Sequence, residues 1–329
     1  MKRFFKNNWD ILKKSFISWN RNDSYARSAT ISYYALFSFP SLLVIVVTIA
    51  GKFFGEEAIQ GKVTDKLGEY IGSEVSRDVE NILVNARVQE GSIWTTIIGL
   101  GVLLFAATGV FFQLKMALNN VWNVAEKKEN FLRTLINRLV SFGMILVLGL
   151  LLMISLVLST LLNALGDVIQ QLIPGIGSFL LYVFNFIISF FAITSLTAAI
   201  FKILPDVKLR WKIAFVGASV TTFFFLLGEF ILGIYFEQSN PGAMYGAASS
   251  IIIILLWVYY SCLIVFFGAE FTVQYALFKN EKVVPTKNAE PAIYKELEEL
   301  RNKKMQVKEE KEVIDELRSN PDKDSDAAT

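Results

Sequence analysis

The sequence predicts an all-α membrane protein with six transmembrane helices, an N-terminal amphipathic helix and a short helical insert outside the cytoplasm. Two features of composition lead to this fold class. Hydrophobic residues make up 53% of the 329-residue chain. Charged residues, 19% of the total, gather at both ends and in the connections and leave long uncharged blocks between them. Six such blocks are long enough for a helix to cross a hydrocarbon core about 30 Å thick.

The residue types that are missing narrow the possible chemistry. The chain has no histidine and a single cysteine, Cys262. This excludes Ser-His and Cys-His catalysis, histidine metal sites, histidine pH sensing and disulfides within the chain. We therefore expect no catalytic residues, no metal and no cofactor. A net charge of +2 indicates no bulk affinity for nucleic acid. No cleavable signal peptide is evident, so we expect the first apolar run to remain as a helix.

Residues 1–27 are predicted to form a cytoplasmic amphipathic segment. Aromatic and aliphatic side chains recur at helical spacing along one stripe of this segment, and its lysines fall off that stripe. The stripe consists of Phe5, Trp9, Leu12, Phe16 and Trp19. This pattern favours a helix on the membrane surface, where lysines meet anionic headgroups. An ordinary helix packed on the rest of the protein is the alternative.

A membrane domain is predicted over residues 28–278. Its spans cover about 31–51, 93–114, 139–162, 179–204, 213–236 and 249–273, with a helical insert at 52–92. Pro40 lies inside the first span and predicts a kink, because proline removes one helical hydrogen bond. The kink is a candidate hinge, although proline more often shapes packing alone.

Basic residues predict the orientation of the chain. The first 27 residues carry seven Lys or Arg, residues 115–138 carry five and residues 202–212 carry four. The insert on the opposite side carries five, and the other two loops on that side carry none. The positive-inside rule therefore places both termini in the cytoplasm.

The charged tail, residues 279–329, is predicted to be cytoplasmic and disordered at its end. Ile293, Leu300, Val307 and Ile314 recur every seven residues. A coiled coil also needs apolar residues at a second position of each heptad, here 297, 304, 311 and 318. Lysine occupies two of these four positions, which favours an exposed helix over a dimerising coiled coil. A homo-oligomer is the alternative arrangement.

Two carboxylates inside the apolar spans are candidates for a substrate or proton pathway, because a charge at membrane depth costs at least about 2.5–3.5 kcal/mol. They are Glu229 in the fifth span and Glu270 in the sixth. Their predicted heights differ by about 20 Å, so they do not form one site. For Glu270, a structural ion pair with Lys115 or Lys202 is the favoured interpretation. For Glu229, a functional and a structural role are equally compatible with the sequence.

Tyr33 and Tyr34, in the first span, are added to the candidate pathway. The loop before the fifth span combines basic residues with an aromatic ring at interface height. Candidate contacts to lipid headgroups there are Lys208, Arg210, Trp211 and Lys212. Topology alone also explains lysines and tryptophan at this position.

Several sequence blocks resemble the YihY/BrkB membrane proteins of bacteria, some of which are labelled ribonuclease BN. The blocks are SYYALFSFPSLL (Ser32–Leu43), ALNNVWNV (Ala117–Val124), LPDVKLRWKIAFVGASV (Leu204–Val220) and YGAASSIIIILLWVYYSCLIVFFGAEF (Tyr245–Phe271). The resemblance covers roughly residues 20 to 280. It implies a multi-pass protein of the bacterial inner membrane with about six spans. Family names suggest virulence, serum resistance or lipid export without defining a reaction.

Three functions are compatible with these features to different degrees. We expect a transporter of an amphiphilic or lipid-like substrate, with membrane lipids as its partners. The alternative is a non-transporting scaffold or envelope-integrity protein. A ribonuclease is disfavoured, because metal-dependent phosphodiester hydrolysis needs clustered carboxylates or histidines and the soluble carboxylates here are scattered. We therefore do not expect an enzyme.

Overall fold

The computed structural model describes residues 2–54, 109–127, 177–239, 249–287 and 289–319, together with positions 60, 61, 64, 76, 77, 80 and 143. Most of these residues are helical. The helices are α1 (Lys2–Arg21), α2 (Ser24–Phe54), α7 (Gly177–Ile203), α8 (Trp211–Ser239), α10 (Ser249–Phe278) and α11 (Ala292–Ser319), and residues 109–121 form a further helical segment.

Three of the described helices are long and apolar enough to cross a membrane. The qualifying stretches are Phe186–Ile203 in α7, Trp211–Ile234 in α8 and Ile251–Phe278 in α10. The predicted spans 93–114 and 139–162, and the insert 52–92, lie mostly outside the described residues. The count of six spans therefore stays a prediction. Helix α2 continues through Pro40, and the role of this proline as a hinge also stays a prediction.

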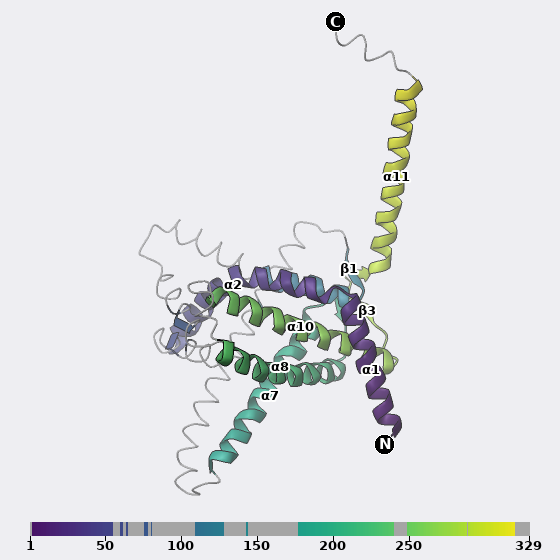
Figure 1. Cartoon of the computed structure of the whole chain (residues 1–329). Helices are drawn as coiled ribbons and strands as arrows, with labels where there is room; N and C mark the ends of the chain where they lie inside the picture. Colours follow the sequence, from purple (N-terminus) through teal and green to yellow (C-terminus); the bar gives the residue numbers. More distant parts are fainter. Residues whose placement is uncertain are drawn as a thin grey trace, which may run out of the picture.

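Helix α10 is the centre of the described bundle. It contacts α1, α2 and α8, and α8 in turn contacts α7. The axes of α2, α8 and α10 are roughly aligned, with α10 antiparallel to α8, and α7 is inclined to them (Figure 1). Fully buried side chains gather where α7 ends and α8 begins, and they include Leu118, Phe201, Ala214, Phe266 and Ala276. The hydrophobic core therefore lies toward one end of the bundle.

Helices α8 and α10 approach closely because a glycine on each faces a threonine on the other. Gly217 of α8 lies against Thr272 of α10, and Gly268 of α10 lies against Thr221 of α8. A Cβ atom added to Gly217 would lie 2.8 Å from the Cβ of Thr272. The Thr221 and Thr272 hydroxyls donate to the carbonyls of Gly217 and Gly268, 2.8 and 2.7 Å away. Small residues and satisfied hydroxyls thus set the register of the two helices.

The described residues are mostly helical, as predicted, and two short antiparallel strand pairs lie at the same end of the bundle. Strand β1 (Val124–Glu126) pairs with β4 (Ala289–Pro291), and β2 (Val207–Lys208) pairs with β3 (Val284–Pro285). Both β3 and β4 follow α10, so the start of the predicted tail is bound to the loops of the bundle. Strands of two or three residues are too short to show the alternation that identifies a strand.

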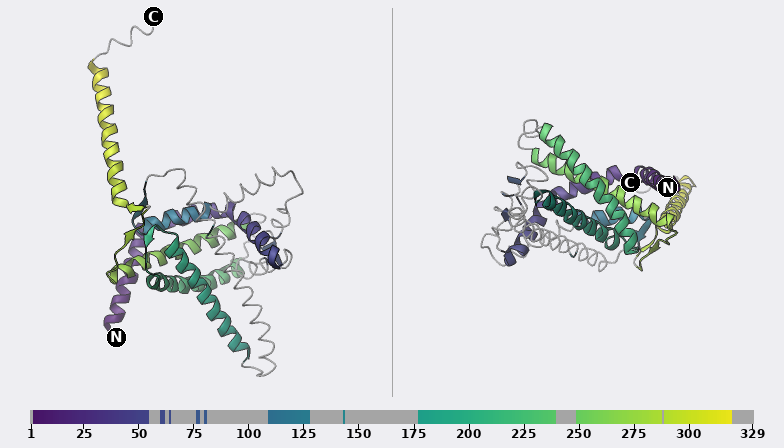
Figure 2. Two further views of the ribbon diagram at one scale, coloured as in Figure 1. Left: turned by 180° about the vertical axis from the view of Figure 1, so that it is seen from behind. Right: turned by 90° about the horizontal axis from the view of Figure 1, so that it is seen from below.

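Helices α1 and α11 lie at the end of the bundle that carries the strands. Both run across the direction of α2, α8 and α10, and they point away from each other (Figure 1). The views from behind and from below show the same arrangement (Figure 2). The two terminal helices therefore extend sideways from one end of the bundle.

The α8–α10 contact predicts the effect of Gly217→Ala. The added methyl group collides with Thr272, and overpacking of this kind costs about 1–3 kcal/mol. We expect a melting temperature several degrees lower for the detergent-purified variant, as measured by scanning fluorimetry. Gly233→Ala is the matched control, because a Cβ there meets no atom within 4 Å. The second substitution Thr272→Ala removes the hydroxyl and methyl groups but keeps the Cβ, so partial restoration is expected. A Gly217→Ala variant as stable as wild type would contradict this contact.

Candidate functional site

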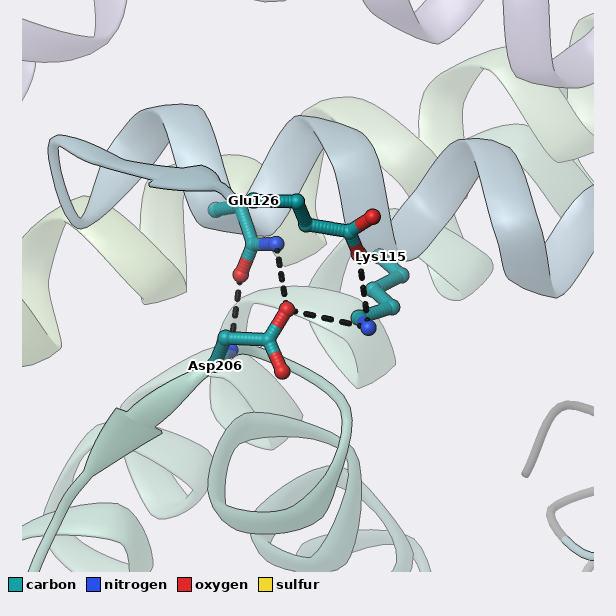
Figure 3. A network of polar contacts seen from close by, with 4 residues as sticks. Lys115, Glu126 and Asp206 are labelled. Carbon is teal, nitrogen blue, oxygen red and sulfur yellow. Dashed lines mark hydrogen bonds and ion pairs between the residues drawn. The ribbon is translucent and has the colours of Figure 1, made fainter. Parts of the chain in front are cut away.

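A buried cluster of charges joins three segments at the strand-bearing end of the bundle (Figure 3). The Lys115 Nζ lies 2.7 Å from Glu126 Oε1 and 2.9 Å from Asp206 Oδ2. Lys115 belongs to the helical segment 109–121, Glu126 to β1, and Asp206 to the turn before β2. All three side chains are at most 15% exposed. One ammonium group therefore bridges two carboxylates away from water.

Neutral groups complete this polar network. The Asn119 amide donates to Asp206 Oδ2 over 3.0 Å, and the Asp206 backbone N–H donates to Asn119 Oδ1 over 2.7 Å. The Asp206 carbonyl accepts from the Thr286 N–H at 2.9 Å. Lys115, Asn119, Glu126 and Asp206 thus link the 109–121 helix, the α7–α8 turn and the segment after α10.

The sequence singled out Lys115 but assigned it the wrong partner. Lys115 pairs with Glu126 and Asp206 rather than with Glu270. The second proposed partner, Lys202, donates to the Leu209 carbonyl. Asn119 and Asp206, which the sequence analysis did not select, lie in two of the blocks that carry the family resemblance. The resemblance marks these blocks but does not indicate that they touch. Within the described ranges no three acidic or cysteine side chains gather as they would around a metal ion.

Glu270 is buried between α10 and α1. Its Oε1 accepts a 2.5 Å hydrogen bond from the Asn22 amide, and Arg21 adds a positive charge nearby. The chain turns sharply between α1 and α2 at Asp23, whose φ is 50°, and Asn22 at this turn contacts α10. Glu270 therefore contacts residues at the end of α1 instead of the predicted lysines. The prediction compared only the heights of residues in the spans, and α1 was not part of that comparison.

An open apolar groove of about 360 Å³ follows the seam between α8 and α10 and is bordered by α1. Its lining residues are Phe16, Trp19, Phe224, Leu227, Ile231, Tyr260, Leu263, Ile264 and Phe267. Trp19 is fixed in place because its Nε1 donates to the Leu263 carbonyl at 3.0 Å. The lining side chains carry only two polar groups, the Tyr260 hydroxyl and the Trp19 indole N–H. The groove therefore suits an apolar chain.

The α8–α10 register places this groove within the predicted hydrocarbon layer. Residues 251–270 span about 30 Å as a helix, which matches a bilayer core. The glycine–threonine contacts put Glu270 level with residues near 219 of α8. Phe267 and Phe224, the lining residues nearest to that level, lie about one helical turn deeper in the spans than Glu270. From there the lining extends about 10 Å further along α8 and α10.

Helix α1 separates this groove from a second, more polar pocket. The second pocket measures about 350 Å³ and is lined by Asp10, Ile11, Lys14, Gln274, Leu277 and Phe278. Ile11 and Ser15 are buried toward the bundle, whereas Trp9 and Phe16 of the predicted stripe are exposed. Part of the predicted apolar stripe is therefore exposed, whereas Trp19 packs against α10, and the membrane-surface interpretation stays a prediction.

Glu229 lies apart from the groove and from Glu270. Gly228 packs against Tyr260, which is ten residues from Glu270 along α10, so the two carboxylates differ in height by about 15 Å. Seven residues before Glu229, Thr222 accepts a hydrogen bond from Thr194 of α7 at 3.0 Å. Helical spacing therefore directs Glu229 toward α7. Among the described residues it is half-buried and has neither a hydrogen bond nor an ion pair.

The remaining candidates lie on the surface of the described structure. Tyr33 and Tyr34 are exposed, and the Tyr33 ring contacts Phe37. They border neither the groove nor the second pocket. Each headgroup candidate is also exposed: Lys208, Arg210, Trp211 and Lys212. Arg210 pairs with Glu281 at 2.8 Å.

Comparisons with known proteins agree with a membrane protein. The profile of a family described as "Virulence factor BrkB" matches residues 16–292. A UPF0761 membrane protein from Alteromonas mediterranea is 28% identical over 81% of this chain and 88% of its own length. One from Vibrio parahaemolyticus is 26% identical over 74% of each chain. One from Aeromonas salmonicida is 26% identical over 77% of this chain and 86% of its own. No solved structure matches the chain.

The polar network predicts a large loss of stability for Lys115→Met. Removing one partner of a buried ion pair costs about 3–5 kcal/mol, because the remaining charges stay buried. We expect a strongly lowered melting temperature in detergent. Arg210→Met is the control, since Arg210 is 77% exposed and exposed pairs contribute only about 0–1 kcal/mol. Equal losses in the two variants would show that the buried network does not hold this end of the bundle.

Proposed function

Because this chain belongs to the BrkB virulence-factor family, whose relatives are named membrane proteins, we propose that it transports an amphiphilic or lipid-like substrate across the bacterial inner membrane. The observation that carries the proposal is the apolar groove between α8 and α10. A polar substrate needs hydrogen-bonding groups in its site, whereas an acyl chain gains from apolar surface. The open side of the groove gives such a chain access.

The groove and its surroundings suit the two parts of an amphiphile. The apolar part would lie against Leu227 and Phe267. Its polar part would lie near the Glu270 level or beyond, where Lys208, Trp211 and Lys212 are exposed. Basic side chains with an aromatic ring at the interface attract lipid phosphates. The second pocket, with Asp10, Lys14 and Gln274, offers further polar surface across α1.

The proposed orientation places both termini in the cytoplasm. Helices α1 and α11 leave the same end of the bundle (Figure 1). The basic residues of the N-terminal segment and of the α7–α8 turn lie at that end, as the positive-inside rule requires of a cytoplasmic face. Membrane lipids are thus the proposed partners, and no cofactor is part of the proposal.

A bulky residue in the groove tests this function. Leu227→Trp fills part of the lining of the groove and is expected to reduce transbilayer movement of a fluorescent phospholipid to the rate of protein-free vesicles. The assay uses purified protein in proteoliposomes and reduction of the outer-leaflet fluorophore by dithionite. Ile234→Trp is the matched control, because Ile234 is on the same helix and exposed but does not line the groove.

Three outcomes of this assay are informative. Loss of movement in Leu227→Trp alone supports the groove as the substrate path. Equal activity in both variants removes the groove from the path. Wild-type vesicles with no lipid movement beyond protein-free vesicles would contradict lipid transport and favour the non-transporting scaffold.

Glu229 is the proposed proton-carrying group of the transporter. Glu229 lies about 15 Å deeper in the predicted membrane layer than Glu270. An ionised carboxylate at that depth costs free energy, so Glu229 is expected to take up a proton when it faces the bilayer interior. Glu229→Gln keeps the shape but cannot ionise. We expect slower lipid movement and loss of its dependence on an imposed pH gradient, at unchanged protein level. Unaltered rates and pH-gradient response would remove Glu229 from the mechanism.

A further inference from the structure

Helix α11 begins at a fixed point on the bundle. Strand β4, immediately before it, pairs with β1, and the Ala292 N–H donates to the Asn123 carbonyl at 2.9 Å. From this anchor the helix runs across the direction of the candidate spans (Figures 1 and 2). A helix with this direction at the end of a membrane-spanning bundle lies parallel to the bilayer plane. Its start is held at the end of the bundle, so its length remains near the membrane surface.

One face of α11 carries unpartnered apolar side chains. Ile293, Leu297, Leu300, Val307 and Ile314 are each about half exposed or more. At 100° per residue they share a single stripe. Single exposed apolar residues need no explanation, but a continuous stripe along a helix indicates a contact surface.

Charges on α11 are segregated about that stripe. Helical spacing puts Lys304 and Lys311 within the stripe, and both are exposed. Six of the eight acidic residues of α11, at positions 298, 299, 309, 310, 312 and 316, fall off the stripe, whereas Glu296 and Asp315 fall at its two edges. A face that combines apolar and basic residues, with most acids turned away, matches the interface of an anionic bilayer.

A second copy of α11 fits this face poorly. In a coiled coil, Lys304 and Lys311 would occupy core positions and face a low-dielectric seam. On a bilayer the same side chains extend their apolar stems along the surface and place their ammonium groups among the phosphates. We propose that α11 docks on the anionic surface of the cytoplasmic leaflet through the face defined by Ile293, Leu297, Leu300, Lys304, Val307, Lys311 and Ile314. This inference is independent of any transport.

Single-site fluorescence on the full-length protein tests the docking. In a Cys262→Ala background, Leu300→Cys and Gln306→Cys would each carry an environment-sensitive fluorophore. Helical spacing puts residue 306 about 120° from residue 300. In vesicles containing phosphatidylglycerol, the label at 300 is expected to shift to the blue and to be quenched by lipids carrying a doxyl group. The label at 306 is expected to show neither effect.

Charge variants identify what holds the helix. Lys304→Glu combined with Lys311→Glu is expected to abolish the blue shift at 300, and vesicles of phosphatidylcholine alone are expected to do the same. Lys295→Glu with Lys303→Glu makes an equal change of charge off the stripe and is expected to leave the shift in place. Equal signals at 300 and 306, or a blue shift that follows protein concentration instead of lipid charge, would overturn the proposal, and the latter would assign the face to a second copy.

Discussion

The ammonium group of Lys115 holds together the end of the bundle on which the other features depend. It neutralises two buried carboxylates that come from β1 and from the α7–α8 turn. In a low-dielectric interior, either carboxylate without this partner would be strongly destabilising. Asn119 and the Thr286 backbone add directed hydrogen bonds to Asp206, so the position of each segment is specified as well as stabilised. The strands, and through them the start of α11, are arranged around this charge.

A second constraint, the glycine–threonine register of α8 and α10, connects the fold to the proposed function. It places Phe224 beside Phe267, and α1 then borders the groove through Trp19. The same register separates Glu229 from Glu270 by about 15 Å, so lipid contact and proton uptake would occur at different depths. The groove lies in the part of α8 and α10 that is predicted to cross the hydrocarbon layer, and the charged network lies at the end of the bundle.

The sequence predicted those features that depend on composition along one helix. Helices α8 and α10 were predictable because their apolar length alone identifies candidate spans, and the α1 stripe followed from helical spacing. The partner of Glu270 was predicted wrongly, because a height estimate cannot show that the turn at Asp23 brings Asn22 to α10. The strands escaped prediction, since two or three residues carry no periodicity. Lys115 and Asp206 are far apart in the chain, and a single sequence contains no sign of their contact.

The pairing of β4 with β1 and of β3 with β2 has a consequence for biosynthesis. Strands β3 and β4 are translated after α10, whereas β1 precedes α7 and β2 lies between α7 and α8. During membrane insertion β1 and β2 must therefore wait for their partner strands until the ribosome has completed α10. Contacts of such long sequence separation form slowly. Closure of the two strand pairs thus marks a nascent chain whose final span has been inserted.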